Sequence, residues 1–208
     1  MLLTEDDKKV IAEAVEKAEL GTSGEIVFAL TDASGHYHHA DLQGALAGSI
    51  LATAVYLMLP TPRTIGMVLG IEIISFALFR ALIPRFPVRR WFISSREMDE
   101  SVHEAAFREF YASGLYKTRE LSGVLIYLSC FERRVVVLAD KGIHEKMGDP
   151  HWNDVRDKII QGIKQGKPRE GICAAIESCG KALAAHFPRR PDDVNELSDQ
   201  VIDRTNQP

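Results

Sequence analysis

Two long apolar segments, LQGALAGSILATAVYLML at residues 42–59 and IGMVLGIEIISFALFRALI at residues 65–83, decide how this chain folds. A helix needs about 20 apolar residues to cross a hydrocarbon layer of about 30 Å, and each segment has roughly that length. The first segment carries no charged side chain, whereas a long helix in a soluble core usually keeps a polar face. The alternative is a pair of buried core helices. We expect instead a transmembrane helical hairpin over residues 42–83.

Basic residues are distributed unequally about these segments. Five arginines lie at the end of the second segment or just beyond it, whereas the turn between the segments has Arg63 alone. An excess of Lys and Arg marks the cytoplasmic side of a membrane. We therefore expect a multi-pass protein of the cell inner membrane with both termini in the cytoplasm. The five arginines are Arg80, Arg85, Arg89, Arg90 and Arg96.

One acidic side chain, Glu72, falls inside the second apolar segment. An antiparallel hairpin places Glu72 opposite Ala52 and Thr53, and Ser75 opposite Ser49. A carboxyl group near the middle of a bilayer costs about 3 kcal/mol on insertion scales and usually faces protein or water. We expect Glu72 to be protonated or hydrogen-bonded within the hairpin or an oligomer.

Two pairs of glycines give the apolar segments small-residue faces. Gly44 and Gly48 lie four residues apart in the first segment, as do Gly66 and Gly70 in the second. Such faces allow helix backbones to approach closely. We expect these faces to contact other membrane proteins or a second copy of the chain, with the lipid bilayer as the remaining partner.

The remainder of the chain alternates helical and strand patterns. Apolar side chains at helical spacing predict helices at residues 4–21, 94–114, 149–166 and 168–186. Short apolar runs predict strands at residues 25–31, 124–129 and 134–139. Continuous apolar strands are buried on both faces. We therefore expect an α/β fold in which helices flank both faces of a small central sheet.

The expected order along the chain places the hairpin inside this α/β domain. Residues 1–35 supply its first helix and strand, and residues 94–187 supply the rest. Residues 188–208 form a polar tail, which we expect to be flexible. The formal net charge is −4, and the basic residues that cluster do so beside the apolar segments, so we expect no nucleic-acid partner.

Six short strings along the chain are together more specific than any single motif. They are TSGEI at residues 22–26, FREFY at 107–111, GLYKTRE at 114–120, GVLI at 123–126, ERRV at 132–135 and ADKGI at 139–143. In this order they resemble the bacterial membrane-anchored branch of the TPM domain family over residues 4–197. The resemblance implies a compact α/β sandwich with a small central sheet.

The same resemblance implies more than one class of function, because relatives include proteins described as acid phosphatases, calcium binders and accessory subunits. Relatives often carry a Gly-x-Gly-Leu-Glu turn after the third strand. The matching residues here are Asp140-Lys-Gly-Ile-His144, with Asp140 in place of the first glycine and His144 in place of the acid.

Acidic residues at strand ends are the candidate metal ligands. Asp32 ends the first strand and Asp140 the third, and ligands of open α/β sheets bind beyond the carboxyl ends of the strands. If the two strands are adjacent and parallel, these carboxylates together with Glu145 or Asp149 could hold Ca²⁺ or Mg²⁺. The alternative is that each Asp caps a turn by accepting backbone N–H bonds.

A second candidate site is basic. Lys117 and Arg119, with Arg133 and Arg134, could bind an anion or a phosphate group. Alternatively, these side chains form surface ion pairs with Glu120 and Glu132, and such pairs contribute little stability.

The sequence favours an interaction or assembly module at the cytoplasmic face of a membrane. The alternative is a weak, metal-assisted acid phosphatase, in which Asp32 and Asp140 bind the metal ion and water attacks a phosphomonoester. No motif in the sequence decides whether the chain is an enzyme.

Overall fold

The computed structural model of the chain describes residues 2–143, 149–190, 192 and 195–205. The chain divides into two compact units. Residues 35–98 form one unit, and residues 1–34 together with 99–208 form the other. We call them the hairpin unit and the sheet unit. The sheet unit is therefore built from two stretches of sequence, with the hairpin unit inserted between them.

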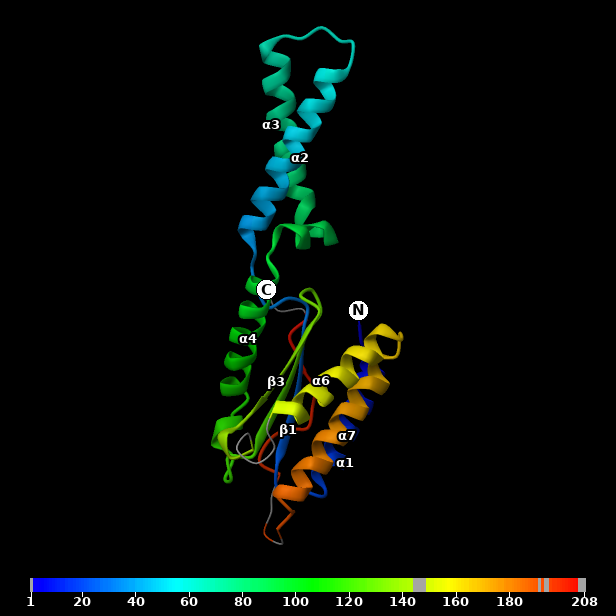
Figure 1. Ribbon diagram of the computed structural model, residues 1–208, viewed down its shortest axis with the longest axis vertical. Coiled ribbons are helices and arrows are strands. Elements are labelled where there is room, and N and C mark those ends of the chain that lie inside the picture. The colour runs from blue at the N-terminus through cyan, green and yellow to red at the C-terminus, as the bar shows by residue number, and fades with distance from the viewer. Residues whose placement is uncertain (1, 144–148, 191, 193–194, 206–208) are drawn as a thin grey trace. The chain divides into compact units, whose positions relative to one another are not determined.

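The sheet unit has a four-stranded sheet in the order β3-β2-β1-β4 (Figure 1). Its strands are β1 (Glu25–Thr31), β2 (Gly123–Ser129), β3 (Arg134–Ala139) and β4 (Ile202–Asp203). Strand β1 runs parallel to β2 and β4, and β3 runs antiparallel to β2. The strands predicted at residues 25–31 and 134–139 are confirmed, and β2 begins one residue before its predicted start.

Helices cover both faces of this sheet, as the sequence predicts. Helices α1 (Glu5–Glu19), α6 (Asp149–Lys164) and α7 (Pro168–His186) pack on one face. Helix α4 (Ser95–Ala112) and the short helix η3 (Leu115–Lys117) pack on the other. Helix α1 begins with a capping box, in which Asp7 N–H donates to Thr4 Oγ1 at 3.2 Å and Thr4 N–H donates to Asp7 Oδ2 at 2.9 Å.

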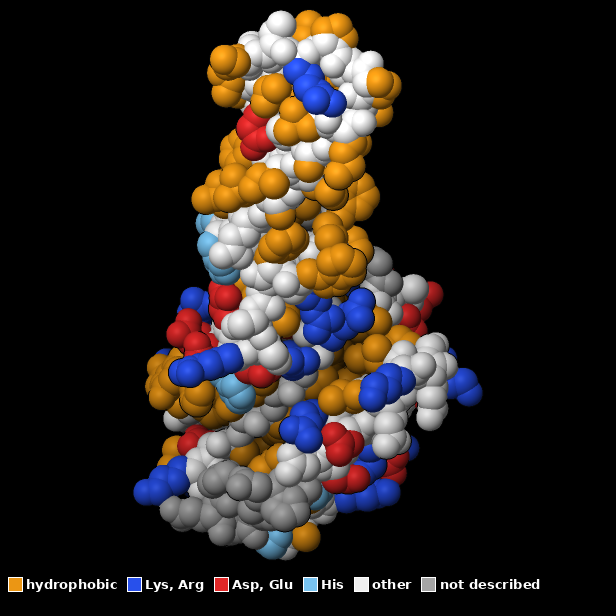
Figure 2. Space-filling view, turned by 45° about the horizontal axis from the view of Figure 1, so that its top comes forward, with side chains coloured by type: hydrophobic (Ala, Val, Ile, Leu, Met, Phe, Trp, Pro, Cys, Tyr) orange, Lys and Arg blue, Asp and Glu red, His pale blue; other side chains and the backbone are white. Residues whose placement is uncertain are grey.

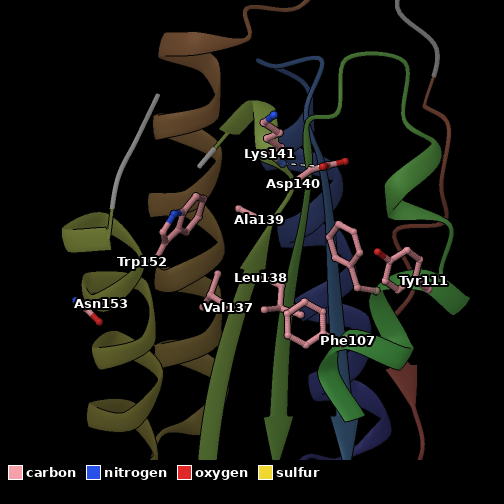
Figure 3. Close-up of a pocket in the computed structure, with 10 residues that line it drawn as sticks. Phe107, Tyr111, Val137, Leu138, Ala139, Asp140, Lys141, Trp152 and Asn153 are labelled. Carbon is pink, nitrogen blue, oxygen red and sulfur yellow. Dashed lines mark hydrogen bonds between the residues drawn. The ribbon is translucent and has the colours of Figure 1, made fainter. Parts of the chain in front are cut away.

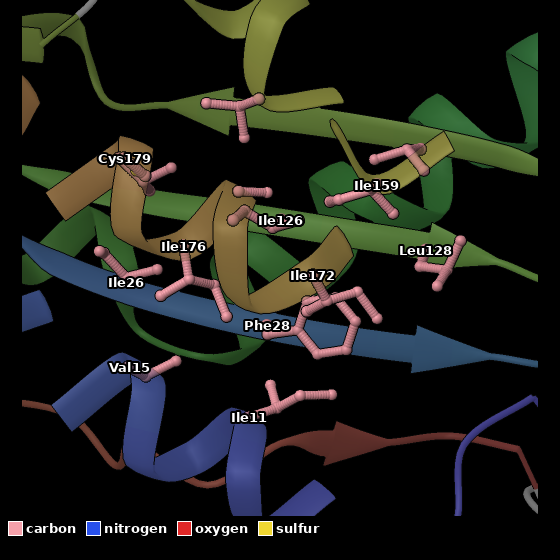
Figure 4. Packing of buried hydrophobic residues seen from close by; sticks show 14 of the residues in the cluster. Ile11, Val15, Ile26, Phe28, Ile126, Leu128, Ile159, Ile172, Ile176 and Cys179 are labelled. Atoms are coloured by element: carbon pink, nitrogen blue, oxygen red, sulfur yellow. The ribbon is translucent and has the colours of Figure 1, made fainter. Parts of the chain in front are cut away.

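Alternate side chains of β1 and β2 fill two separate cores. Ile26 and Phe28 of β1 point toward α1 and α7, where they meet Ile172 and Ile176 (Figure 4). Val27 and Ala29 point the other way, toward α4. All residues of β1 and β2 are buried, because each strand has a covered face on both sides.

Part of the tail that was expected to be flexible over residues 188–208 pairs with the sheet. Strand β4 pairs with Ala29 and Leu30 of β1. Beside it, the Arg204 guanidinium donates to both carboxylate oxygens of Glu109, at 3.2 and 3.1 Å. A two-residue strand shows no periodicity in sequence, so composition alone indicated a solvated tail.

The hairpin unit contains the two predicted apolar helices, α2 (His38–Met58) and α3 (Ile65–Leu82), followed by the short helices η1 (Ile83–Arg85) and η2 (Pro87–Phe92). Both α2 and α3 are long and apolar enough to cross a membrane. In the most apolar stretch of α2, 22% of the residues are buried. In the most apolar stretch of α3 and η1 taken together, none is buried. Apolar side chains therefore dominate the visible surface of the hairpin (Figure 2). This exposure is unlike that of core helices in a soluble protein.

The carboxylate of Glu72 is hydrogen-bonded within the hairpin, as predicted. Ser49 Oγ donates to Glu72 Oε1 at 2.8 Å, and Thr53 Oγ1 donates to Oε2 at 2.5 Å. The hydroxyl of Ser75, which was expected opposite Ser49, donates to the carbonyl of Ile71 in its own helix at 2.6 Å.

The two glycine faces have different surroundings. A Cβ atom at Gly48 would lie 2.7 Å from the ring of Phe79, and one at Gly44 would lie 3.1 Å from Ile83. The Gly44/Gly48 face is thus packed against residues 79–92 of the same chain, and its use for association between chains stays a prediction. At Gly66 and Gly70, a Cβ would meet no described heavy atom within 4 Å, so association through that face stays a prediction.

We expect Gly48→Leu to destabilise the hairpin by about 1–3 kcal/mol, because the added side chain overlaps the Phe79 ring. The thermal unfolding midpoint of the full chain in detergent micelles measures this effect. Gly70→Leu is the matched control, since it makes the same change in helix propensity at an open position. An equal loss of stability in both variants would contradict this packing.

Candidate functional site

The sheet topology separates the two acidic residues that were expected to share a metal ion. Asp32 follows the end of β1, whereas Asp140 follows the end of β3, which is antiparallel to β2 and separated from β1 by it. The two carboxylates therefore lie at opposite ends of the sheet, roughly 20 Å apart for strands of this length. The proposed metal pair, and with it the phosphatase mechanism, is not supported by this geometry.

The surroundings of Asp140 match the turn-capping alternative. Its Oδ1 atom accepts the backbone N–H of Lys141 at 2.7 Å, and its own N–H donates to Gly123 O at 2.9 Å. Glu145 lies outside the described residues, and of Asp149 only the backbone at the start of α6 is described. Within the described ranges, no group of three His, Cys, Asp or Glu side chains is placed to hold a metal ion such as Ca²⁺ or Mg²⁺.

The four basic candidates for an anion site fall into two separate pairs. Lys117 and Arg119 precede β2, whereas Arg133 and Arg134 lie at the opposite end of that strand. Arg119 Nη1 lies 3.2 Å from Asp192 Oδ2, and Arg134 Nε lies 2.5 Å from Asp99 Oδ1. The structure therefore does not bring these four side chains into one site.

The expected ion-pair partners, Glu120 and Glu132, also differ from the sequence-based interpretation. Glu120 Oε1 pairs with Arg190 at 2.7 Å. Glu132 is fully buried, where it accepts the hydroxyl of Ser129 and the backbone N–H of Ser34, the latter at 3.0 Å. Ser34 is the last residue of the sheet unit before the hairpin unit. Glu132 therefore holds the exit of the chain against the β2–β3 turn.

The structure has a groove beside strand β3 that the sequence did not reveal as a site. It is a cavity of about 540 Å³ between α4 and α6 (Figure 3). Phe107 and Tyr111 of α4 stand on one side of β3, and Trp152 of α6 stands on the other. We call it the β3 groove and define it by the residues Phe107, Phe110, Tyr111, Val137–Lys141, Trp152 and Asn153.

Exposed aromatic side chains form one wall of the β3 groove. Phe107 is 52% exposed and Tyr111 is 61% exposed, whereas Trp152 is buried. The Tyr111 ring lies 5.2 Å from that of Tyr116, measured between centroids. The sequence could have indicated this wall, because Phe107 and Tyr111 are four residues apart and therefore lie on one side of α4, outside its buried stripe.

Strand β3 also presents backbone groups to this groove. Asp140 N–H bonds to Gly123 O, so alternate residues of β3 bond to β2 and the others direct their N–H and C=O groups away from it. The outward residues are Val135, Val137 and Ala139. No described strand pairs with this side of β3. The groove therefore combines apolar surface with backbone donors and acceptors.

A third feature is the carboxyl group of Glu19, near the start of β1. Its Oε1 atom accepts Ile26 N–H at 2.7 Å, which lowers the pKa, but burial has the larger effect and raises the pKa of Glu19 to about 9. The nearby carboxylates of Glu25 and Asp199 raise it further. Glu19 is thus protonated in the folded protein at neutral pH.

We expect this protonation to make stability depend on pH. The pKa of Glu19 is raised from 4.5 to about 9, so the unfolded chain binds fewer protons between these values, and stability falls as pH rises through this window. One such group contributes at most about 1.4 kcal/mol per pH unit. Unfolding midpoints of the full chain in detergent, measured from pH 5 to 9, should fall less in Glu19→Gln than in the wild type. Glu16→Gln, at an exposed position of the same helix, should keep the wild-type slope, and an unchanged slope in Glu19→Gln would contradict the assignment.

Comparison with protein families gives a match over part of the chain. The family model of the TPM domain matches residues 89–182. The chain contains a TPM domain. The match includes α4, β2, β3 and α6, so both walls of the β3 groove belong to it. Two of the strings that carry the resemblance, FREFY at 107–111 and ADKGI at 139–143, contribute residues to the groove.

A solved structure with a similar fold is the NMR structure of BA42 protein from the psychrophilic bacterium Bizionia argentinensis. The alignment covers 97% of this chain and 94% of that chain, with 24% sequence identity and a TM-score of 0.60. At this identity the similarity concerns the fold alone. Comparison with curated proteins gave no match.

Proposed function

We propose that this TPM domain is a membrane-anchored interaction module, in which α2 and α3 cross the inner membrane and the β3 groove binds a segment of another membrane-associated protein. The exposed aromatic wall of the groove carries the interaction part of the proposal. The exposed apolar surface of the hairpin carries the anchoring part.

Anchoring is supported by the large apolar side chains that α2 and α3 leave uncovered. Leu51 is 65% exposed, and Ile73 and Ile74 of α3 are 68% and 70% exposed. Burying one such side chain gains about 1.5–3 kcal/mol relative to exposure to water, so a lipid environment stabilises the hairpin strongly. Glu72 is compatible with lipid because its hydrogen bonds are made inside the hairpin.

Charge supports an orientation with both chain ends in the cytoplasm. The end of α3 and the residues after it carry Arg80, Arg85, Arg89, Arg90 and Arg96, whereas the turn at residues 59–64 carries Arg63 alone. The basic end of a hairpin stays on the cytoplasmic side.

The β3 groove is the surface best suited to a protein partner. Tyr and Phe side chains are typical anchors of protein interfaces, because a large apolar area is buried with few rotatable bonds. The outward backbone groups of Val137 and Ala139 can bond to an extended segment laid beside β3. A partner that supplies such a segment would cover both features at once.

We expect the full chain to remain in the membrane pellet after alkaline carbonate extraction and to require detergent for release. In intact cells, an impermeant maleimide should label a Thr61→Cys variant, whereas a Ser198→Cys variant should react only after lysis. The labelling of the unsubstituted chain is measured in parallel and subtracted, because the native cysteines can also react with the maleimide. A chain that stays in solution without detergent would contradict anchoring, and the reverse labelling pattern would contradict the orientation.

We expect a photo-crosslinking residue at position 107 to give a discrete adduct with a partner in native membranes. Tyr111→Asp should remove that adduct, because a carboxylate would be placed in the apolar wall of the groove. The control is the same crosslinker at Leu20, which is 61% exposed on another part of the sheet unit. Equal adducts at both positions, or an adduct that survives Tyr111→Asp, would count against the groove.

A further inference from the structure

A second cavity of the sheet unit lies at the other end of β3 and α6 from the β3 groove. It has a volume of about 510 Å³ and is lined by residues at the ends of β1 and β2, at the start of β3 and in the last turns of α6. Small-molecule sites in proteins have volumes of about 300–1,000 Å³, and in open α/β sheets they lie beyond the carboxyl ends of the strands. We call this cavity the strand-end cavity.

Aliphatic side chains from three parts of the chain line the strand-end cavity. Leu128 of β2 and Val135 of β3 are 2% and 7% exposed, and both belong to the core that α6 and α7 cover. Leu128 lies at one end of the row of core residues in Figure 4. Ile160 and Ile163 of α6, with Leu2 before α1, are partly buried and pack against the same core. The interior of the cavity therefore suits an aliphatic chain.

Exposed charged side chains line the same cavity. They are Arg133 in the β2–β3 turn, Lys164 at the end of α6 and Asp32 after β1. Glu132, beside Arg133, is fully buried and outside the lining, where it accepts the backbone N–H of Ser34 at 3.0 Å. The lining therefore has two cationic groups and one carboxylate, and its net positive charge favours an anionic group at the opening.

The backbone of Arg133 is a separate observation that indicates a site. Its φ angle is 54°, in the left-handed region that glycine adopts with little strain and that is uncommon for residues with a side chain. The β2–β3 turn therefore carries a long cationic side chain where glycine would fit the backbone better. Non-glycine residues in such conformations cluster at functional sites, and Arg133 lines the cavity.

We propose that the strand-end cavity binds an anion with a single aliphatic chain, such as the carboxylate of a fatty acid. The chain lies against Leu128, Val135 and the isoleucines of α6, and the carboxylate contacts Arg133 and Lys164. Guanidinium groups bind carboxylates through paired N–H donors, and the aliphatic chain is removed from water. This inference is independent of the proposed function, because the described linings of the β3 groove and of this cavity share no residue.

Two cysteines make occupancy of the cavity measurable in the unsubstituted chain. Cys130 lines the strand-end cavity, whereas Cys173 lines a different groove, between α1 and α7. Both are half-buried, and burial raises the pKa of the Cys130 thiol to about 11 and also raises the pKa of the Cys173 thiol. Alkylation by N-ethylmaleimide is therefore slow enough to follow at mildly alkaline pH, because the thiolate is the reacting form. Cys173 serves as an internal control.

The full chain in phosphatidylcholine nanodiscs is alkylated with and without octanoate, and mass spectrometry of its peptides follows each cysteine. We expect octanoate at about ten times its dissociation constant to slow the alkylation of Cys130 about tenfold and to leave Cys173 unchanged. At equal free concentration, 1-octanol and octylamine should protect Cys130 less. No protection of Cys130, or equal protection of both cysteines, would overturn the site. Protection by 1-octanol or octylamine that equals protection by octanoate would overturn the anionic class.

Substitution tests the two cationic side chains. Arg133→Gly suits a φ angle of 54°, so the variant should fold, and its thermal unfolding midpoint checks this. Combined with Lys164→Gln, it should reduce the protection by octanoate to that by 1-octanol, because the charged contacts are lost. Lys9→Gln, at a 75% exposed position of α1, is the control and should keep the full protection. Each variant is compared with itself without ligand, so that a changed reactivity of Cys130 cancels. Undiminished protection in the double variant would overturn the assigned contacts.

Discussion

The parallel pairing of β1 with β2 is the contact on which the rest of the TPM domain depends. The two strands pair over seven residues, from Glu25 with Gly123 to Thr31 with Ser129, although the whole hairpin unit lies between them in sequence. The entropy cost of closing such a connection grows only slowly with its length, and a hairpin that folds locally shortens the effective loop. The favourable free energy comes from the burial of apolar side chains, since the pair of strands is covered on both faces.

Local sequence pattern predicted the features that depend on local geometry. Strands at residues 25–31 and 134–139 follow from short apolar runs, and the contact of Glu72 with Thr53 follows from the geometry of an antiparallel helix pair. The bond from Ser49 to Glu72 was not predicted, because Ser49 was expected opposite Ser75. Strand order is not local, whereas the direction of β3 is, because residues 130–133 are too short a connection for a parallel strand. Asp32 and Asp140 were expected together because each ends a strand, but the antiparallel strand β3 ends at the other end of the sheet. The pairing of Ile202 and Asp203 with β1 was missed because it depends on strand order.

The candidate site was harder to predict because its residues come from different elements. Phe107 and Tyr111 were visible in sequence as part of a family string, but their exposure depends on which face of α4 the sheet covers. Trp152 reaches the same groove from a helix that packs on the opposite face of the sheet. Such a site exists only once β3 is placed at the edge, so periodicity within a single element could not indicate it.

The buried carboxylate of Glu132 has a wider consequence for the architecture. Its bond to Ser34 holds the outgoing chain at the β2–β3 turn, and the pairing of Arg134 with Asp99 holds the returning chain at the same turn. Both junctions of the insertion are therefore neighbours on one rigid support. The chain therefore leaves and re-enters the sheet unit beside one turn, so the length of what lies between Ser34 and Asp99 places no demand on the order of the strands.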